Sequence, residues 1–146
     1  RQPQGTTRAY ASKNPLTKAD QSTLASLLQA LGCYYPVAEE QLDAVTALSG
    51  SGPAYVFQFV EALQAAGSEM GLESELANAL AVETLLGSAQ LLKNSADSPS
   101  QLRQAVTSPN GTTAAALDVL NQSNFNQIIL RALQAAKARS QALAKA

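Results

Sequence analysis

The chain has 146 residues, of which 46% are hydrophobic and only 14% are charged, and its formal net charge is −1. A chain of this length can bury a hydrophobic core, and this hydrophobic content excludes a disordered tail. The nearly neutral charge argues against a nucleic-acid-binding protein and against a polybasic membrane anchor.

Two residue counts narrow the chemistry that is open to the chain. It has no histidine, which excludes Ser-His-Asp triads and histidine-ligated zinc, and Cys33 is its single cysteine, which excludes an internal disulfide. We therefore expect no metal site. No apolar run is long enough to span a bilayer, so we expect no membrane segment. A single thiol fits a reducing compartment, and we expect a cytoplasmic location. Because the chain opens at Arg1 rather than at a methionine, we expect a processed, tagged or truncated product.

The composition predicts a mainly helical chain. Alanine (28), leucine (21) and glutamine (14) are strong helix formers, whereas valine and isoleucine, which favour strands, together number nine. At the start of the chain we expect a short strand over 6–11, followed by a helix. Thr17 is the predicted N-cap of that helix, Asp20 is an acidic residue at its N3 position, and Gly32 is a natural stop.

A second strand is predicted at 33–38, where aromatic and β-branched residues gather. Pro36 suggests an edge position, and we expect Cys33 to be buried as a small hydrophobe. Two strands and one helix are marginal as an independent unit. Residues 1–38 therefore look like the end of a larger α/β domain.

A long apolar helix is predicted in the middle of the chain. A helix over 39–48 is interrupted by the run Ser49-Gly50-Ser51-Gly52, and Pro53 then stands at a position typical of N1 of a new helix. This new helix, over 53–70, ends at Gly71 and confines its few polar residues to one narrow stripe. A helix that is apolar on most sides is buried. A chain of this size can rarely surround such a helix by itself, and we therefore expect a partner chain.

Four more helices are predicted in the second half of the chain. The first is expected over 74–93 with Ser74 as its N-cap, and the second runs from a capping box at Ser98 to about residue 107. The third is expected over 113–121, and the fourth begins after a cap at Ser123 or Asn124. Small residues on the first of them predict that another helix approaches closely; they are Ala77, Ala81, Gly87 and Ser88.

The strongest local motif is the loop between the second and third of these helices. Pro109-Asn110-Gly111 predicts a turn with one left-handed position, and Thr112 and Thr113 then open a helix. Free backbone N–H groups at a helix N-terminus form a site for a carboxylate or a phosphate. The alternative is a simple connector with a threonine N-cap, and spacing alone favours the connector.

The run Ser49-Gly50-Ser51-Gly52 is the second candidate. Its two glycines would let a backbone or a ligand approach closely. The alternative is a hinge between domains that binds nothing, which local evidence favours. The run lacks the GxGxxG pattern, so a nucleotide site here is weakly supported.

Both motifs resemble segments of one enzyme family, pyrroline-5-carboxylate reductase. Residues 43–57 read DAVTALSGSGPAYVF and resemble the junction segment of that family, and residues 101–113 read QLRQAVTSPNGTT and resemble its substrate loop. Gly71-Leu72, Leu86-Gly87 and Phe125 also match the family pattern. The resemblance is dense from about residue 39 onward and weak before it.

The resemblance implies a fold and an activity. Enzymes of this family reduce 1-pyrroline-5-carboxylate to L-proline with NADH or NADPH, using an N-terminal Rossmann domain and a C-terminal helical domain that forms a homodimer, often within a decamer. Residues 1–43 would then be the remnant of the dinucleotide-binding domain and 44–146 the helical dimerisation and substrate-binding domain. The glycine-rich phosphate loop of the family is not in this sequence, so we expect no cofactor-binding residue here and an inactive fragment.

The resemblance also implies the site residues. Ser108, Asn110, Gly111, Thr112 and Thr113 would bind the substrate, with backbone N–H groups at its carboxylate and the Thr113 hydroxyl at its ring nitrogen. Asn110 stands where the family commonly has glycine, and asparagine tolerates a positive φ. Ser49-Gly50-Ser51-Gly52 is the candidate active-site hinge. The competing hypothesis is a non-catalytic helical oligomerisation module.

Overall fold

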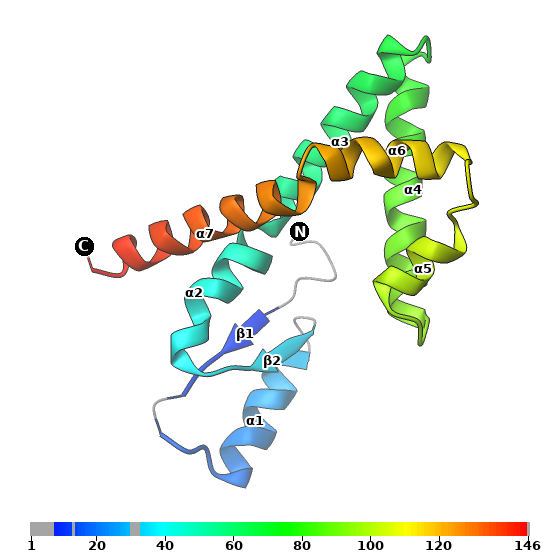
Figure 1. Ribbon diagram of the computed structural model, residues 1–146. Helices are drawn as coiled ribbons and strands as arrows, with labels where there is room; N and C mark the ends of the chain where they lie inside the picture. Colours follow the sequence, from blue (N-terminus) through cyan, green and yellow to red (C-terminus); the bar gives the residue numbers. More distant parts are fainter. Residues whose placement is uncertain (1–7, 13, 30–32, 146) are drawn as a thin grey trace. The chain divides into compact units, whose positions relative to one another are not determined.

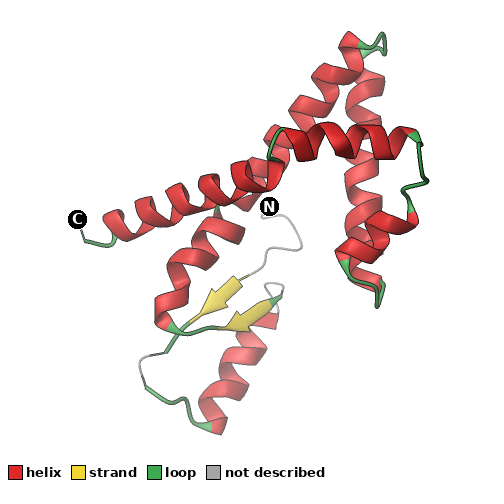
Figure 2. Ribbon diagram, in the orientation of Figure 1, coloured by secondary structure: helices red, strands yellow, loops and turns green. Residues whose placement is uncertain are grey.

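The computed structural model describes residues 8–12, 14–29 and 33–145, and it divides into two units. The first unit comprises Arg1–Pro53 and Arg131–Ala146, and the second comprises Ala54–Leu130. Helices dominate both units, which confirms the predicted mainly helical class with a small strand–helix–strand segment (Figures 1 and 2). The predicted domain boundary between residues 43 and 44 stays a prediction.

The first unit begins with a parallel pair of strands joined by a helix. Strand β1 (Arg8–Tyr10) pairs with β2 (Tyr34–Pro36) in the register Arg8↔Tyr34, and α1 (Lys18–Gln29) connects them. The tyrosine rings of Tyr10 and Tyr34 lie with their centroids 6.3 Å apart. This is the arrangement predicted for the segment, although both strands are shorter than expected. The first two residues of the predicted strand over 6–11, and the predicted stop at Gly32, lie outside the described residues.

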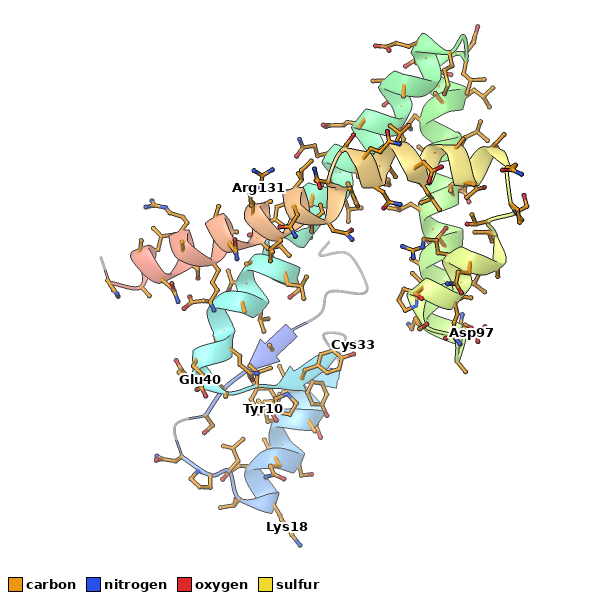
Figure 3. The ribbon with its side chains drawn as sticks, in the orientation of Figure 1. Tyr10, Lys18, Cys33, Glu40, Asp97 and Arg131 are labelled. Atoms are coloured by element: carbon orange, nitrogen blue, oxygen red, sulfur yellow. The ribbon has the colours of Figure 1, made fainter. Side chains whose placement is uncertain are left out.

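The expected burial of Cys33 is wrong for this chain. Cys33 directly precedes β2 and is exposed (Figure 3). The prediction assumed a sheet that is covered, as an apolar strand in a complete α/β domain would be. In the described ranges the sheet has two strands, and β2 itself is exposed at Tyr35 and Pro36.

Helix α1 begins at the predicted cap. The N–H of Asp20 donates to Thr17 Oγ1 over 3.2 Å, and the N–H and hydroxyl of Thr17 donate to Asp20 Oδ2 over 3.1 and 2.6 Å. These reciprocal bonds satisfy backbone donors that the helix itself leaves free. The side-chain bond from Thr17, followed by the backbone bond from the same residue, lowers the pKa of Asp20 below its ordinary value.

Helical structure is continuous over most of the junction segment. A 3₁₀ turn at Glu39–Gln41 leads into α2 (Leu42–Val45), then into a π-helical turn at Thr46–Gly50, and α3 (Gly52–Glu69) begins after Ser51. The sequence predicted a helix over 39–48 and a break at Ser49-Gly50-Ser51-Gly52. The structure confirms an interruption but confines it to Ser51, between the π-helical turn and α3. The helix widens before this point, and the N–H of Ser51 donates to the carbonyl of Thr46 over 2.8 Å.

The second unit is built on two antiparallel helices, α3 and α4 (Ser74–Asn94), which lie side by side in Figure 1. Helix α3 ends in a Schellman motif. Gly71 has a φ of +97°, its N–H donates to the carbonyl of Ser68, and the N–H of Leu72 donates to the carbonyl of Gly67. Glycine adopts this left-handed conformation without a steric penalty, which explains the predicted stop.

Small residues form the contact between α3 and α4. Gly67, Ala77 and Ala81 are buried, and a Cβ placed on Gly67 would lie 3.0 Å from Cβ of Ala77. The predicted close approach is therefore confirmed at Ala77, and Ala81 is buried on the same helix. Gly87 and Ser88 do not take part, because both are exposed in the described structure.

Three helices complete the chain: α5 (Pro99–Ala105), α6 (Thr112–Gln122) and α7 (Phe125–Leu143). The predicted capping box of α5 is present, with Ser98 Oγ accepting from the N–H of Gln101. The predicted cap of α4 is wrong by one residue, because Glu73 holds the N-cap position. Asn124, before α7, has a φ of +56°. None of the described helices has the length and apolarity that crossing a membrane requires.

Candidate functional site

The predicted turn forms as expected between α5 and α6. The N–H of Gly111 donates to the carbonyl of Ser108 over 3.0 Å, which closes a four-residue turn. Pro109 occupies the second position of this turn, and Asn110 occupies the third with a φ of +59°. Proline followed by a residue of positive φ fits a type II turn. The left-handed position predicted for this loop is therefore confirmed, and it falls on Asn110.

Position 111 lies close against Ser108. The φ of Gly111 is −82°, which any residue can adopt. A Cβ on Gly111, however, would lie 3.1 Å from the carbonyl oxygen of Ser108 and would overlap Oγ of the same serine. The loop therefore folds back on itself so closely that a side chain at position 111 would require the Ser108 hydroxyl to rotate and its carbonyl oxygen to give way by a few tenths of an ångström.

The loop leads directly into the N-terminus of α6. Gly111 is the N-cap of this helix and Thr112 is its first residue, so the expectation that a threonine caps it is wrong. Gly111 has no side chain to accept a hydrogen bond, and the first N–H groups of a helix have no partner within it. The N–H groups of Thr112 and Thr113 are therefore available to an anion, and the helix dipole adds positive charge there.

The five predicted residues of the loop differ in exposure. Ser108, Asn110 and Thr112 are exposed, whereas Gly111 and Thr113 are half-buried. Thr113 thus combines an available N–H with a hydroxyl in a partly shielded position. The loop itself contains no lysine or arginine, so backbone dipoles must supply most of its attraction for an anion.

A polar cleft of about 250 Å³ lies beside the loop, between α5 and α6. Charged and amide groups line it; they are Arg103, Gln104, Asp118 and Asn121, with Thr107 and Leu117. Thr107 was not among the predicted site residues, and its hydroxyl donates to the carbonyl of Arg103 over 2.6 Å. The sequence signal that could have identified Thr107 is a threonine just after the end of a capped helix, because its hydroxyl can donate to the carbonyl four residues earlier.

The candidate hinge Ser49-Gly50-Ser51-Gly52 spans the π-helical turn and the start of α3. The half-buried Ser49 donates its hydroxyl to the carbonyl of Val45 over 3.1 Å. A Cβ on Gly50 would meet Thr46 at an ordinary 3.6 Å, and one on Gly52 would meet nothing within 4 Å of it in the described structure. Neither glycine is therefore required by packing there. The hinge belongs to the first unit and the loop to the second.

An apolar groove of about 480 Å³ runs along α3 and α4. We call it the α3–α4 groove, and its apolar lining consists of Val56, Phe57, Val60, Val82, Leu85, Leu86 and Ala89. Phe57 is 65% exposed and Leu86 is 49% exposed. Among the described residues no large side chain is fully buried, and Ala47, Ala77 and Ala81 are the buried apolar ones. Helices with such exposed apolar faces need a further surface to cover them.

Comparison with known proteins places these features in a family. The family pattern described as "Pyrroline-5-carboxylate reductase dimerisation" matches residues 39–143. The chain is 41% identical over 130 residues to pyrroline-5-carboxylate reductase 2 of Bacillus subtilis, covering 89% of this chain and 45% of that protein. It is 43% identical over 133 residues to pyrroline-5-carboxylate reductase of Synechocystis, covering 90% of this chain and 50% of that protein.

Solved structures agree with this assignment. A pyrroline-5-carboxylate reductase from Coxiella burnetii has a TM-score of 0.88 at 39% identity, covering 92% of this chain and 50% of that one. A Plasmodium falciparum pyrroline carboxylate reductase with NADP bound has a TM-score of 0.82 at 33% identity, covering 92% of this chain and 55% of that one. The chain spans about half the length of the curated relatives it matches. Because the family pattern covers most of its residues, this chain belongs to the pyrroline-5-carboxylate reductase family.

Proposed function

We propose that this chain is the dimerisation and substrate-binding part of a reductase that converts 1-pyrroline-5-carboxylate to L-proline with NADH or NADPH, in the cytoplasm. One observation supports this proposal above all. The loop Ser108–Thr113 presents free N–H groups at the start of α6, in a chain whose residues 39–143 match the family. The substrate carries a carboxylate, and such N–H groups bind carboxylates.

The carboxylate is proposed to lie against Thr112 and Thr113. The N–H of Gly111 is already engaged with the carbonyl of Ser108, so the next two N–H groups are the better donors. Gly111 and Asn110 then act by shaping the turn, and Ser108 lies beside them with an exposed side chain. This division of roles refines the expectation that the whole loop contacts substrate.

Thr113 is the proposed catalytic residue. Its half-buried hydroxyl stands next to the carboxylate donors, and its oxygen can accept from the protonated ring nitrogen of the substrate. Hydride addition to this iminium form gives the neutral amine without a further proton. Hydride addition to a carbon–nitrogen double bond depends mainly on orienting the two reactants and on placing charge, which dipoles and one hydroxyl can provide. The absence of histidine from the sequence is compatible with this chemistry.

The described residues do not themselves fit a dinucleotide. Their sheet has two strands, and between β1 and α1 they carry no glycine-rich turn of the kind that binds pyrophosphate. We therefore assign cofactor binding to another part of the reductase, and we expect no saturable binding of NADPH by this chain alone. Calorimetric titration with NADPH tests this, and a micromolar dissociation constant would contradict it.

We also propose that two copies of this chain form a homodimer through their apolar helix faces. The α3–α4 groove supports this, because its phenylalanine and leucine side chains are exposed on helices that are otherwise poor in charge. The matching family pattern is itself described as a dimerisation domain. Assembly of such dimers into a decamer stays a prediction from the resemblance.

A non-catalytic oligomerisation module is the second candidate, and the two-stranded sheet without a phosphate-binding turn favours it for the chain alone. The deciding experiment uses the full-length protein with 1-pyrroline-5-carboxylate and either NADPH or NADH. Formation of proline with stoichiometric oxidation of the nucleotide is expected. Failure of both nucleotides, in a protein that is folded and dimeric, would favour the oligomerisation module instead.

A further inference from the structure

Thr107 is the last residue before the substrate loop, and it makes two hydrogen bonds back to α5. Its N–H donates to the carbonyl of Gln104 over 3.0 Å, and its hydroxyl donates to the carbonyl of Arg103 over 2.6 Å. The last carbonyls of a helix have no partner within it. From a half-buried position, Thr107 therefore satisfies the carbonyl of Arg103 and shares the carbonyl of Gln104 with the N–H of Val106.

These bonds are followed along the chain by two further hydrogen bonds that lead from the loop into α6. After Thr107, the carbonyl of Ser108 accepts from the N–H of Gly111 over 3.0 Å. The carbonyl of Gly111 then accepts from the N–H of Ala115, inside α6, over 3.1 Å. The direction in which the chain leaves Thr107 thus sets the position of Ser108, and Ser108 in turn sets that of Gly111 and the start of α6.

The place of Thr107 between the helices supports the same role. Its side chain lines the polar cleft between α5 and α6, together with Leu117 of α6. Rotation of Thr107 would break the bond to Arg103 and would also alter the spacing between the helices that flank the loop. The Thr107 hydroxyl is held in one orientation, because its hydrogen is directed at the Arg103 carbonyl.

We propose that Thr107 is a positioning residue for the substrate carboxylate. Its hydrogen bonds go to α5 rather than to the substrate, and by fixing the point at which the loop leaves α5 they hold the N–H groups of Thr112 and Thr113 where the carboxylate binds. This inference rests on the proposed function of the loop. The hydrogen bonds from the loop to the carboxylate strengthen the binding of substrate and transition state alike, because the carboxylate does not change during the reaction. Loss of the Thr107 hydroxyl is therefore expected to raise KM and to leave kcat nearly unchanged.

The test uses three variants of the full-length reductase. Thr107→Val keeps the branched shape and removes the hydroxyl, Thr107→Ala removes the hydroxyl and the methyl group, and Thr107→Ser keeps the hydroxyl. We expect both variants without the hydroxyl to raise the KM for 1-pyrroline-5-carboxylate by about three- to tenfold, the effect of one hydrogen bond. The KM for the nicotinamide cofactor and kcat should change less than about twofold, and Thr107→Ser should restore the KM of the wild type.

Thr23→Val is the matched control. The hydroxyl of Thr23 donates to the carbonyl of Ala19 over 3.0 Å, which is the same four-residue back-bond, in α1. This control should have the KM of the wild type. An unchanged KM in both hydroxyl-free variants, or a failure of serine to restore it, would overturn the role of Thr107. A wild-type protein that does not reduce the imine would instead contradict the proposed function itself.

Discussion

Ser140 on α7 donates a hydrogen bond of 2.6 Å to the Oδ1 atom of Asp43 on α2, although 97 residues separate them in the chain. Both side chains are half-buried, and both belong to the first unit. The bond therefore fastens the C-terminal helix to the segment that leads into the π-helical turn. A hydrogen bond to a carboxylate is stronger than one between neutral groups.

Ser140→Ala should lower the stability of the first unit. The substitution leaves the Asp43 carboxylate without this donor in a half-buried position, which should reduce the free energy of unfolding by about 1 kcal/mol. Urea unfolding at one fixed protein concentration measures this as a lower midpoint with an unchanged slope. Ser26→Ala is the control, because Ser26 donates to the carbonyl of Ser22 within α1, and that bond is exposed. Equal midpoints for both variants would show that the Asp43 bond adds nothing.

Gly67→Val should weaken the contact between α3 and α4. A Cβ at Gly67 would lie 3.0 Å from that of Ala77, and valine adds two more methyl groups to a buried site. Overpacking of this kind costs about 1–3 kcal/mol. Ala77→Gly removes the methyl group that the new side chain meets. In a double-mutant cycle monitored by thermal unfolding, the penalty of the double variant should therefore be smaller than the sum of the two single penalties, and strict additivity would contradict the contact.

The parts of the fold that depend on short-range chemistry could be predicted from the sequence. The caps at Thr17 and Ser98 and the stop at Gly71 each involve residues within a few positions of one another. The π-helical turn could not be predicted, because the N–H groups of the same residues can donate to carbonyls either four or five residues earlier. Hydrophobic periodicity does not distinguish the two.

The candidate site divides in the same way. The turn at Pro109-Asn110 follows from local preferences, and it formed. The threonine cap was wrong, because the close approach of Gly111 to Ser108 places Gly111 at the N-cap instead. The burial of Cys33 was wrong, since burial depends on what covers a strand. The bond between Asp43 and Ser140 depends on tertiary structure and leaves no local pattern in the sequence.

The chain should be a homodimer that a single charge in the α3–α4 groove disrupts. We expect the interface to bury more than about 2,000 Å², as obligate interfaces do. Phe57→Glu places an unpaired charge on the groove and should shift the chain toward monomer at micromolar concentration, as measured by analytical ultracentrifugation. Leu27→Glu is the control, since Leu27 is similarly exposed but lies on α1 in the other unit. A stable wild-type monomer at that concentration would contradict the dimer.

Gly111→Ala should impair the full-length reductase through the loop alone. The new Cβ would meet the carbonyl and hydroxyl oxygens of Ser108, so the turn must shift. Small displacements of positioning groups are costly, and we expect kcat/KM to fall about 10- to 100-fold. Asn110→Gly is the control, because glycine accepts the positive φ at that position and should keep the activity. Equal kcat/KM for Gly111→Ala and the wild type would show that the turn does not set the site.

Thr113→Val should lower kcat/KM of the full-length reductase about 10- to 150-fold and leave the dimer intact. Valine keeps the shape and the backbone N–H of Thr113 and removes only its hydroxyl. If the hydroxyl oxygen accepts from the protonated ring nitrogen during hydride transfer, its loss costs about 1.5–3 kcal/mol, the value of a hydrogen bond to a charged group. Steady-state kinetics beside the wild type, with sedimentation to confirm the dimer, measures the effect. Thr112→Val is the control, because Thr112 is exposed and is proposed to contribute its N–H alone. An unchanged kcat/KM in Thr113→Val would mean that the Thr113 hydroxyl has no catalytic part.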